Sequence, residues 1–327
     1  MKNKIIKNVL LCSLAVPCMF GLTACREKEI SANEYTDLVY EAGKNYINKH
    51  NEYKTFGDMS TTFSNDTELV EKVEVTYKES ASATDTTTKE YDEVTTYKDS
   101  QTIDINRDET ENGDISMKLT TTNKTTISGK RANAETSLLE SYEKTTETTT
   151  VVTLLKEGTS YKFYENVKTV TKETGETAET NETKKVYTFE SQEDYKEAIE
   201  YLIDKINNNQ VYDMLSASEE FLIVNPDMYK DGDDFGMSYS YSGTYASESN
   251  DKMSKSTMSS SAEFKDNLPH KSSISMNGEG SDGSTTSVKQ SITVNYSASA
   301  ISAPEGSTDY TESNLNYSNI TIQDLGI

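Results

Sequence analysis

Two acidic stretches contain residue types that could bind a metal ion. In the first, Asp104, Asn106 and Asp108 supply oxygen atoms at the first, third and fifth positions of a calcium-loop pattern. The sixth position is Glu109, where the turn requires glycine, and the twelfth is Ile115, where a glutamate should bind. The pattern therefore favours an acidic hairpin tip over a calcium site.

The second acidic stretch surrounds Gly232. Its carboxylates come from Asp227, Asp231, Asp233 and Asp234. Tyr229 occupies the third position of this loop, which excludes an EF-hand. Weak surface binding of calcium, with a dissociation constant of ~10⁻⁴–10⁻³ M, stays open. We predict no dedicated metal site in either stretch.

Catalytic chemistry has few candidate residues. The two histidines, His50 and His270, have no cysteine or second histidine at ligand spacing. The sequence lacks the nucleophile elbow, the zinc-protease motif, the Walker loop and the dinucleotide-binding glycine pattern. We therefore predict that the protein is not an enzyme and needs no cofactor. The alternative, a hydrolase that uses carboxylates, would require a cleft with coupled acids.

Charge excludes one class of partner. The 327 residues include 32 Lys and Arg against 55 Asp and Glu, which gives a formal net charge of −23. Binding to nucleic acid requires basic side chains that release counterions from phosphates, so we predict no nucleic-acid partner. Only 33% of the residues are hydrophobic, but the 21 tyrosines add large, partly apolar side chains. We expect a folded protein with a thin core.

The N-terminus is typical of a secretory signal. Three lysines within the first seven residues precede an apolar run from Val9 to Leu22. Ser13, Pro17 and Gly21 interrupt this run, which is shorter than the ~20 residues of a membrane-spanning helix. The run is therefore interpreted as the hydrophobic region of a cleaved leader.

The run ends in Leu22-Thr23-Ala24-Cys25, which resembles the lipobox of bacterial lipoproteins. The resemblance implies cleavage between Ala24 and Cys25 and a diacyl modification of the Cys25 sulfur. Residues 1–24 would be the signal peptide and 25–30 a lipidated tether. The implied location is the extracytoplasmic face of the cell membrane, to which the lipid anchors the protein. The alternative is an ordinary signal peptide in which Cys25 is incidental.

Helical periodicity occurs in two segments. Over 31–54 the apolar stripe comprises Tyr35, Leu38, Val39, Ala42, Tyr46 and Ile47. Ser31 and Glu34 form a capping box at its start. Over 191–207 the stripe comprises Tyr195, Ala198, Ile199, Leu202, Ile203 and Ile206, and Ser191 marks the start. A third helix is predicted over 211–224.

Alternating apolar and polar residues elsewhere predict antiparallel strands with one buried face. They form a first meander over about 60–190 and a second over about 235–305. The predicted class is α+β, with a single domain over 31–327. Its curved antiparallel sheet has one apolar face, and two or three helices cover the concave side.

This element order resembles the LolA/LppX-like family of envelope lipoproteins and lipoprotein carriers. Three features carry the resemblance: the helix after the tether, the hairpin Leu154–Tyr164, and the closing segment Ile292–Glu305. The Ser/Thr-rich stretch 242–262 departs from the family pattern. The family fold is a half-barrel of strands with helices in its mouth and an apolar cavity between them. The implied candidates for the cavity lining are Tyr35, Leu38, Val39, Tyr161, Phe163, Tyr195, Ile199 and Leu202.

Two non-enzymatic functions follow as expectations. The first is a lipid-anchored envelope lipoprotein that binds a hydrophobic or amphipathic ligand in the cavity between sheet and helices. The alternative is a structural or adhesive envelope protein that binds a partner and whose core is filled. A cavity of ligand size, usually ~300–1,000 Å³, distinguishes the two.

Overall fold

The computed structural model describes residues 28–54, 61–82, 85–107, 114–132, 138–206, 226–246, 253–280, 283–298 and 300–314. The lipobox, Asp108 and the predicted helix over 211–224 lie outside these ranges.

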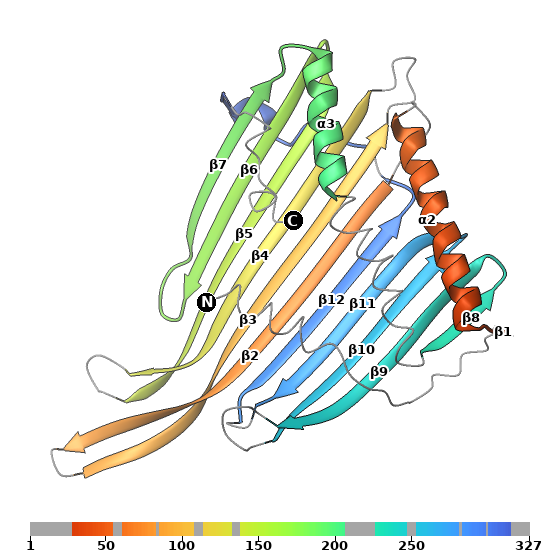
Figure 1. The fold of residues 1–327 in the computed structure, drawn as a ribbon. Helices are drawn as coiled ribbons and strands as arrows, with labels where there is room; N and C mark the ends of the chain where they lie inside the picture. Colours follow the sequence, from red (N-terminus) through yellow and green to blue (C-terminus); the bar gives the residue numbers. More distant parts are fainter. Residues whose placement is uncertain are drawn as a thin grey trace.

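One sheet of thirteen strands dominates the described part of the chain (Figure 1). The first seven strands in the sequence are β1 (Lys28–Glu29), β2 (Thr61–Ser82), β3 (Asp85–Arg107), β4 (Ile115–Ala132), β5 (Leu139–Glu157), β6 (Ser160–Glu173) and β7 (Glu179–Thr188). The others are β8 (Asp227–Asp231), β9 (Asp234–Ala246), β10 (Met253–Lys265), β11 (Leu268–Glu279), β12 (Thr285–Asn295) and β13 (Thr311–Glu312).

The two meanders meet in the middle of the sheet. The strand order is β1-β8-β9-β10-β11-β12-β2-β3-β4-β5-β6-β7-β13, so β12 pairs with β2. All neighbours are antiparallel except β7 and β13, which are parallel. The predicted antiparallel sheet is confirmed. Its size makes the class mostly β where the sequence predicts α+β, and the described strands form an open sheet that does not close into a barrel.

Hydroxyl side chains form hydrogen bonds across the long strands. β-Branched threonine favours extended backbone, and cross-strand pairs stabilise a sheet on both faces. Thr148 and Thr169 are hydrogen-bonded at 3.0 Å across β5 and β6, and Ser261 and Ser273 at 2.8 Å across β10 and β11. The Ser/Thr-rich stretch 242–262 thus contributes to two regular strands, with 247–252 outside the described residues.

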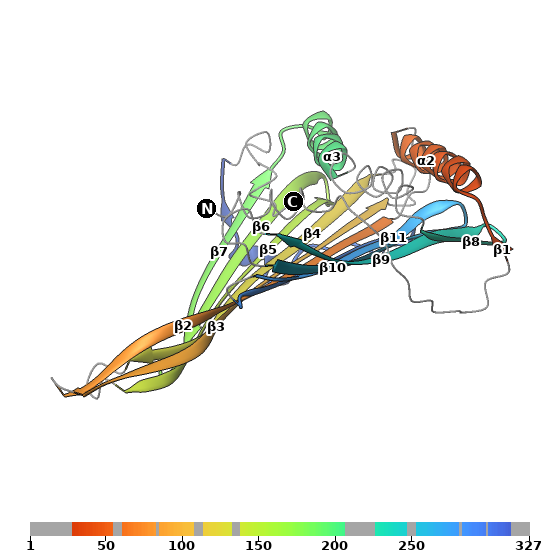
Figure 2. The same cartoon turned by 60° about the horizontal axis from the view of Figure 1, so that its bottom comes forward.

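Two helices lie on one face of the sheet, named here the helix face, while the opposite face is the back face (Figure 2). They are α2 (Ala32–Lys54) and α3 (Gln192–Ile206), where the periodicity predicts helices. The Glu34 amide donates to Ser31 Oγ at 3.2 Å, and the Asp194 amide donates to Ser191 Oγ at 3.1 Å. Each serine thereby satisfies an amide that the first helical turn leaves unpaired.

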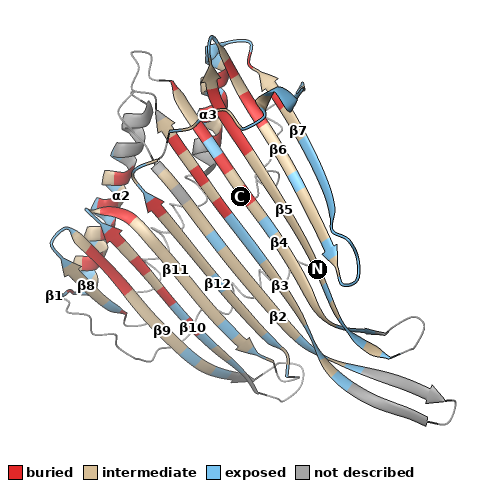
Figure 3. Ribbon diagram, turned by 180° about the vertical axis from the view of Figure 1, so that it is seen from behind, coloured by how far each residue is buried: buried red, intermediate tan, exposed pale blue. Residues whose placement is uncertain are grey.

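Burial is concentrated at the strand ends beneath the helices (Figure 3). There the apolar residues of α2 and α3 cover the sheet, and the opposite ends of the long strands extend beyond them (Figure 1). A small third cluster lies on the back face, where Ala303 and Tyr310 pack against Leu155, Tyr164 and Val186. The segment that contains Ala303 and Tyr310 therefore covers the apolar residues that β5, β6 and β7 present to the back face.

Candidate functional site

The described chain begins at one edge of the sheet. Lys28 and Glu29 of β1 pair with Lys230 and Tyr229 of β8. Neither helix of the described residues is both long enough and apolar enough to span a membrane.

Five of the predicted cavity residues meet where α3 packs on the sheet: two come from β6 and three from α3 itself. Tyr161, Phe163, Tyr195, Ile199 and Leu202 are all at most 8% exposed and belong to one cluster. The ring centroids of Tyr161 and Tyr195 are 4.7 Å apart. These side chains contact each other and the apolar residues of β3, β4 and β5. In the described structure they form packed core.

The other three predicted residues belong to α2 and pack in a separate cluster between this helix and the sheet. Tyr35 and Val39 are buried and Leu38 is partly buried. The Tyr35 ring meets the Phe235 ring edge-on at 5.9 Å, and Phe235 stacks on Phe264 at 4.4 Å. The structure thus divides the eight predicted lining residues between two packed clusters. That these residues line a ligand cavity stays a prediction.

A charged network borders the α3 cluster. Asp114 is only 6% exposed. Its carboxylate accepts hydrogen bonds from Lys156 Nζ at 2.6 Å, Tyr161 OH at 3.0 Å and Gln192 Nε2 at 3.1 Å. The hydrogen bond that Lys156 donates to Asp114 raises the pKa of Lys156, and burial is the main cause of the raised pKa of Tyr161. The network fixes the first turn of α3 to strands β5 and β6.

Replacing Asp114 by asparagine is expected to lower the free energy of unfolding by about 1–3 kcal/mol, because hydrogen bonds to a charged, buried group are lost. Urea denaturation of the two proteins measures the difference. Glu190→Gln is the control, since Glu190 is an exposed acid two residues before α3. Equal losses for both variants would contradict a role for the network.

Beyond the helices, the helix face carries a line of apolar side chains across six neighbouring strands. Register pairing places these residues opposite one another, and we call them the apolar row: Tyr241, Met258, Met276, Val288, Leu69 and Tyr97. Side chains alternate between faces along a strand. The row therefore shares the face of Met237 and Ala262, which pack beneath α2. Met258 is buried, and the other five residues are half-buried.

Charge is divided between the two faces of these strands. Glu71, Glu93 and Asp99 lie on the helix face near the row, as their register and the alternation of side chains show. The Lys and Arg residues of these six strands whose side chains the structure describes all lie on the back face: Lys72, Lys98, Lys255, Lys265, Lys271 and Lys289. The surroundings of the row are consequently acidic.

The sequence contains the apolar residues of the row but gives no sign that they form a line. Tyr239 and Tyr241, or Ile274 and Met276, alternate along a strand as in any half-buried sheet. Only the strand order and register place Leu69 beside Val288, more than 200 residues away.

Tyr239 lies beside the row and donates a hydrogen bond to Met258 Sδ at 3.8 Å. Burial raises its pKa to about 12, whereas an unfolded tyrosine ionises near pH 10. Between these values the unfolded chain loses the proton and the folded chain keeps it, so rising pH favours unfolding.

We therefore expect the contribution of Tyr239 to the free energy of unfolding to be fully present below about pH 10. It should be lost as the pH rises towards 12. Tyr239→Phe should flatten this fall, measured as the urea midpoint at a series of pH values. Tyr40→Phe is the control, because Tyr40 is 65% exposed. A pH dependence that is unchanged in Tyr239→Phe would contradict the prediction.

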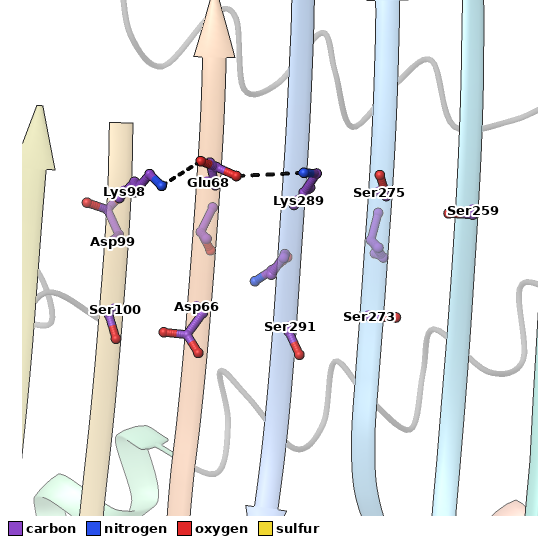
Figure 4. Close-up of a pocket in the computed structure, with 13 residues that line it drawn as sticks. Asp66, Glu68, Lys98, Asp99, Ser100, Ser259, Ser273, Ser275, Lys289 and Ser291 are labelled. Atoms are coloured by element: carbon purple, nitrogen blue, oxygen red, sulfur yellow. Dashed lines mark ion pairs between the residues drawn. The ribbon is translucent and has the colours of Figure 1, made fainter. Parts of the chain in front are cut away.

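The back face has a shallow, open hollow of 480 Å³ in the middle of the sheet (Figure 4). Serines from β10, β11 and β12 form much of its floor. Lys98 and Lys289 approach Glu68 at 2.8 and 3.8 Å, and the hydrogen bond from Lys98 lowers the Glu68 pKa. Because Glu68 neutralises both cations, the hollow does not select an anion.

The described residues contain no group of three acidic, histidine or cysteine side chains that could hold a metal ion. Asp104 instead accepts a hydrogen bond from Thr62 Oγ1 at 2.7 Å. In the second acidic loop, Asp231 pairs with Asp234 across the turn that joins β8 to β9, and Gly232 supplies the positive φ of 60°. His270 Nδ1 lies 3.1 Å from the Val294 carbonyl oxygen.

The fold defines the chain as a mostly β protein built on one large open sheet. No protein-family model and no curated protein sequence matches it. The transport unit of the autotransporter AIDA-I from Escherichia coli is 8% identical, with a TM-score of 0.24 over 79% of this chain and 98% of that chain.

Two other solved structures are similarly distant. The translocator domain of the autotransporter NalP from Neisseria meningitidis is 8% identical, with a TM-score of 0.17 over 81% of this chain and 99% of that chain. A β-barrel-like protein of the DUF1849 domain of unknown function from Brucella abortus is 12% identical, with a TM-score of 0.13 over 73% and 98%. These weak similarities assign no family.

Proposed function

We propose that this chain is a non-enzymatic lipoprotein, anchored through acylated Cys25 to the extracytoplasmic face of the cell membrane. It binds a hydrophobic or amphipathic ligand on the helix face of its sheet. The apolar row is the observation that carries the binding function, because it extends across six strands on the face that the helices share. The proposed location at the membrane rests on the lipobox, Leu22-Thr23-Ala24-Cys25.

The LolA/LppX-like half-barrel remains the finer proposal for the fold. A helix that follows the tether and an antiparallel sheet with both helices on one face support it. The ligand would then contact the sheet between or beside α2 and α3. Its binding surface would differ from the eight residues implied by the resemblance, because these pack into two buried clusters.

The second candidate is a structural or adhesive envelope protein whose partner binds outside a filled core. The packing of those eight residues favours it, since side chains in mutual contact leave no room for a ligand among them. This candidate keeps the lipid anchor and the absence of enzymatic activity, but it requires no small ligand.

Native mass spectrometry of residues 26–327, which lack the lipid-bearing Cys25, purified from cells, distinguishes the two candidates. A reproducible added mass, followed by organic extraction of the ligand, would support the first candidate. A clean apo mass that also resists added fatty acid, phospholipid and lipopeptide would support the second. The lipid anchor is tested separately by the substitution of Cys25.

A further inference from the structure

We infer that the apolar row is a docking site for a cationic amphipathic peptide helix. The inference rests on the proposed binding function of the helix face and names the chemical class of the ligand. Three properties of the described residues carry it: the direction of the row, its relation to α2 and the sign of the charges around it.

The direction of the row suits a helix. The row crosses six strands, and five strand spacings of ~4.8 Å give it a length of about 24 Å. A helix rises 1.5 Å per residue, so about 16 residues would follow the row from end to end. A strand that added to the sheet would instead run along an edge, at right angles to the row.

Helix α2 already packs on this sheet in the same direction. Its residue Tyr35 contacts Phe235 and Phe264 on β9 and β10, and Tyr46 belongs to a cluster with Leu268 and Val294 on β11 and β12. The axis of α2 therefore crosses the strands, as Figure 1 shows.

The row lies beside α2 on the helix face, somewhat farther away than a helix in direct contact with α2 would lie. Tyr241 follows Met237, which packs beneath α2, by four residues, or about 13 Å along β9. Packed helices have axes about 8–10 Å apart. A helix on the row would thus share the face of α2 without packing tightly against it.

Charge selects a cationic helix. Glu71 and Asp99 are each two residues from a member of the row on the same face, and Glu93 is four residues from Tyr97. The described Lys and Arg side chains of these strands all face the other way. An acidic helix would meet like charge, whereas a basic one would pair with it. The partly exposed Met276 adds a flexible, polarisable contact that adapts to a peptide.

The test uses residues 26–327, without the lipid-bearing Cys25, and a labelled 16-residue peptide of leucine and lysine. Its leucines recur at spacings of three and four, so one face of the helix is apolar. A scrambled peptide of the same composition and a leucine–glutamate peptide are the control ligands. Fluorescence anisotropy measures affinity. We expect saturable binding of the ordered cationic peptide alone.

Two pairs of variants locate the site. The double variant Leu69→Thr and Met276→Thr removes apolar contacts from the row and should weaken binding by about tenfold or more. Val70→Thr is its control, on the same strand but on the back face. Glu71→Gln should weaken binding about threefold and reduce its salt dependence, whereas Asp66→Asn on the back face should not.

Three results would overturn the inference: no binding of the cationic peptide, equal binding of the acidic peptide, or a row variant that binds like Val70→Thr. Binding that appears only when residues 207–225 are deleted would assign the row to that segment and also overturn it. If the peptide fails but native mass spectrometry finds a bound lipid, this inference fails while the proposed function stands.

Discussion

Replacing Cys25 by serine is expected to abolish the incorporation of labelled fatty acid into this protein. The thiolate sulfur is the only acceptor that the lipobox offers, and serine provides no sulfur to form the thioether bond. Two acyl chains give stable anchoring because each buried methylene contributes about 0.8 kcal/mol, whereas one chain binds only marginally. The variant should therefore lose the whole anchor in a single step.

Metabolic labelling followed by immunoprecipitation measures this result, and the mass of the product shows whether the leader is removed. Cys18→Ser is the matched control, because Cys18 lies within the leader and should have no effect on the label. A labelled Cys25→Ser protein would show that Cys25 is incidental and that the leader is an ordinary signal peptide.

The second large effect is expected in the α3 cluster. Phe163 is 2% exposed and is surrounded by apolar residues of β4, β5 and α3. Phe163→Ala should lower the free energy of unfolding by about 3–5 kcal/mol, because the lost apolar contact is compounded by the cavity left behind. Urea denaturation measures this loss as a lower midpoint with a nearly unchanged slope.

Tyr40→Ala is the control for Phe163→Ala. Tyr40 is 65% exposed, so its truncation should change stability by about 0.5 kcal/mol or less. The comparison also separates the two candidate functions. A ring that faces a ligand cavity loses fewer contacts on truncation, so a loss below about 1 kcal/mol for Phe163→Ala would favour a cavity over packed core.

Local features of the fold can be predicted from the sequence because they depend on residues close together in the chain. Ser31 and Ser191 each lie three residues before the amide that they cap, so the helix starts can be identified without tertiary contacts. The alternation of residues such as Ile103 and Ile105 likewise indicates which side chains share a face.

The buried network and the division of the predicted lining are not visible in the sequence. Asp114 looks like one more acid beside a turn, but its partners Lys156 and Gln192 come from 42 and 78 residues further along the chain. Tyr35 and Tyr195 both belong to apolar helix stripes, yet they pack in different clusters. Periodicity gives the face of a helix, but it does not say which strands lie beneath it.

By itself, the sequence determined the two helix starts and the antiparallel strands, and it predicts a secretory leader with a lipid anchor. The tertiary structure alone decided that β12 pairs with β2, that both helices share a face, and that six strands align the apolar row while turning their described lysines away from it. The physical reason is that alternation fixes the face of a side chain, whereas its neighbours across the sheet depend on strand order and register between distant segments.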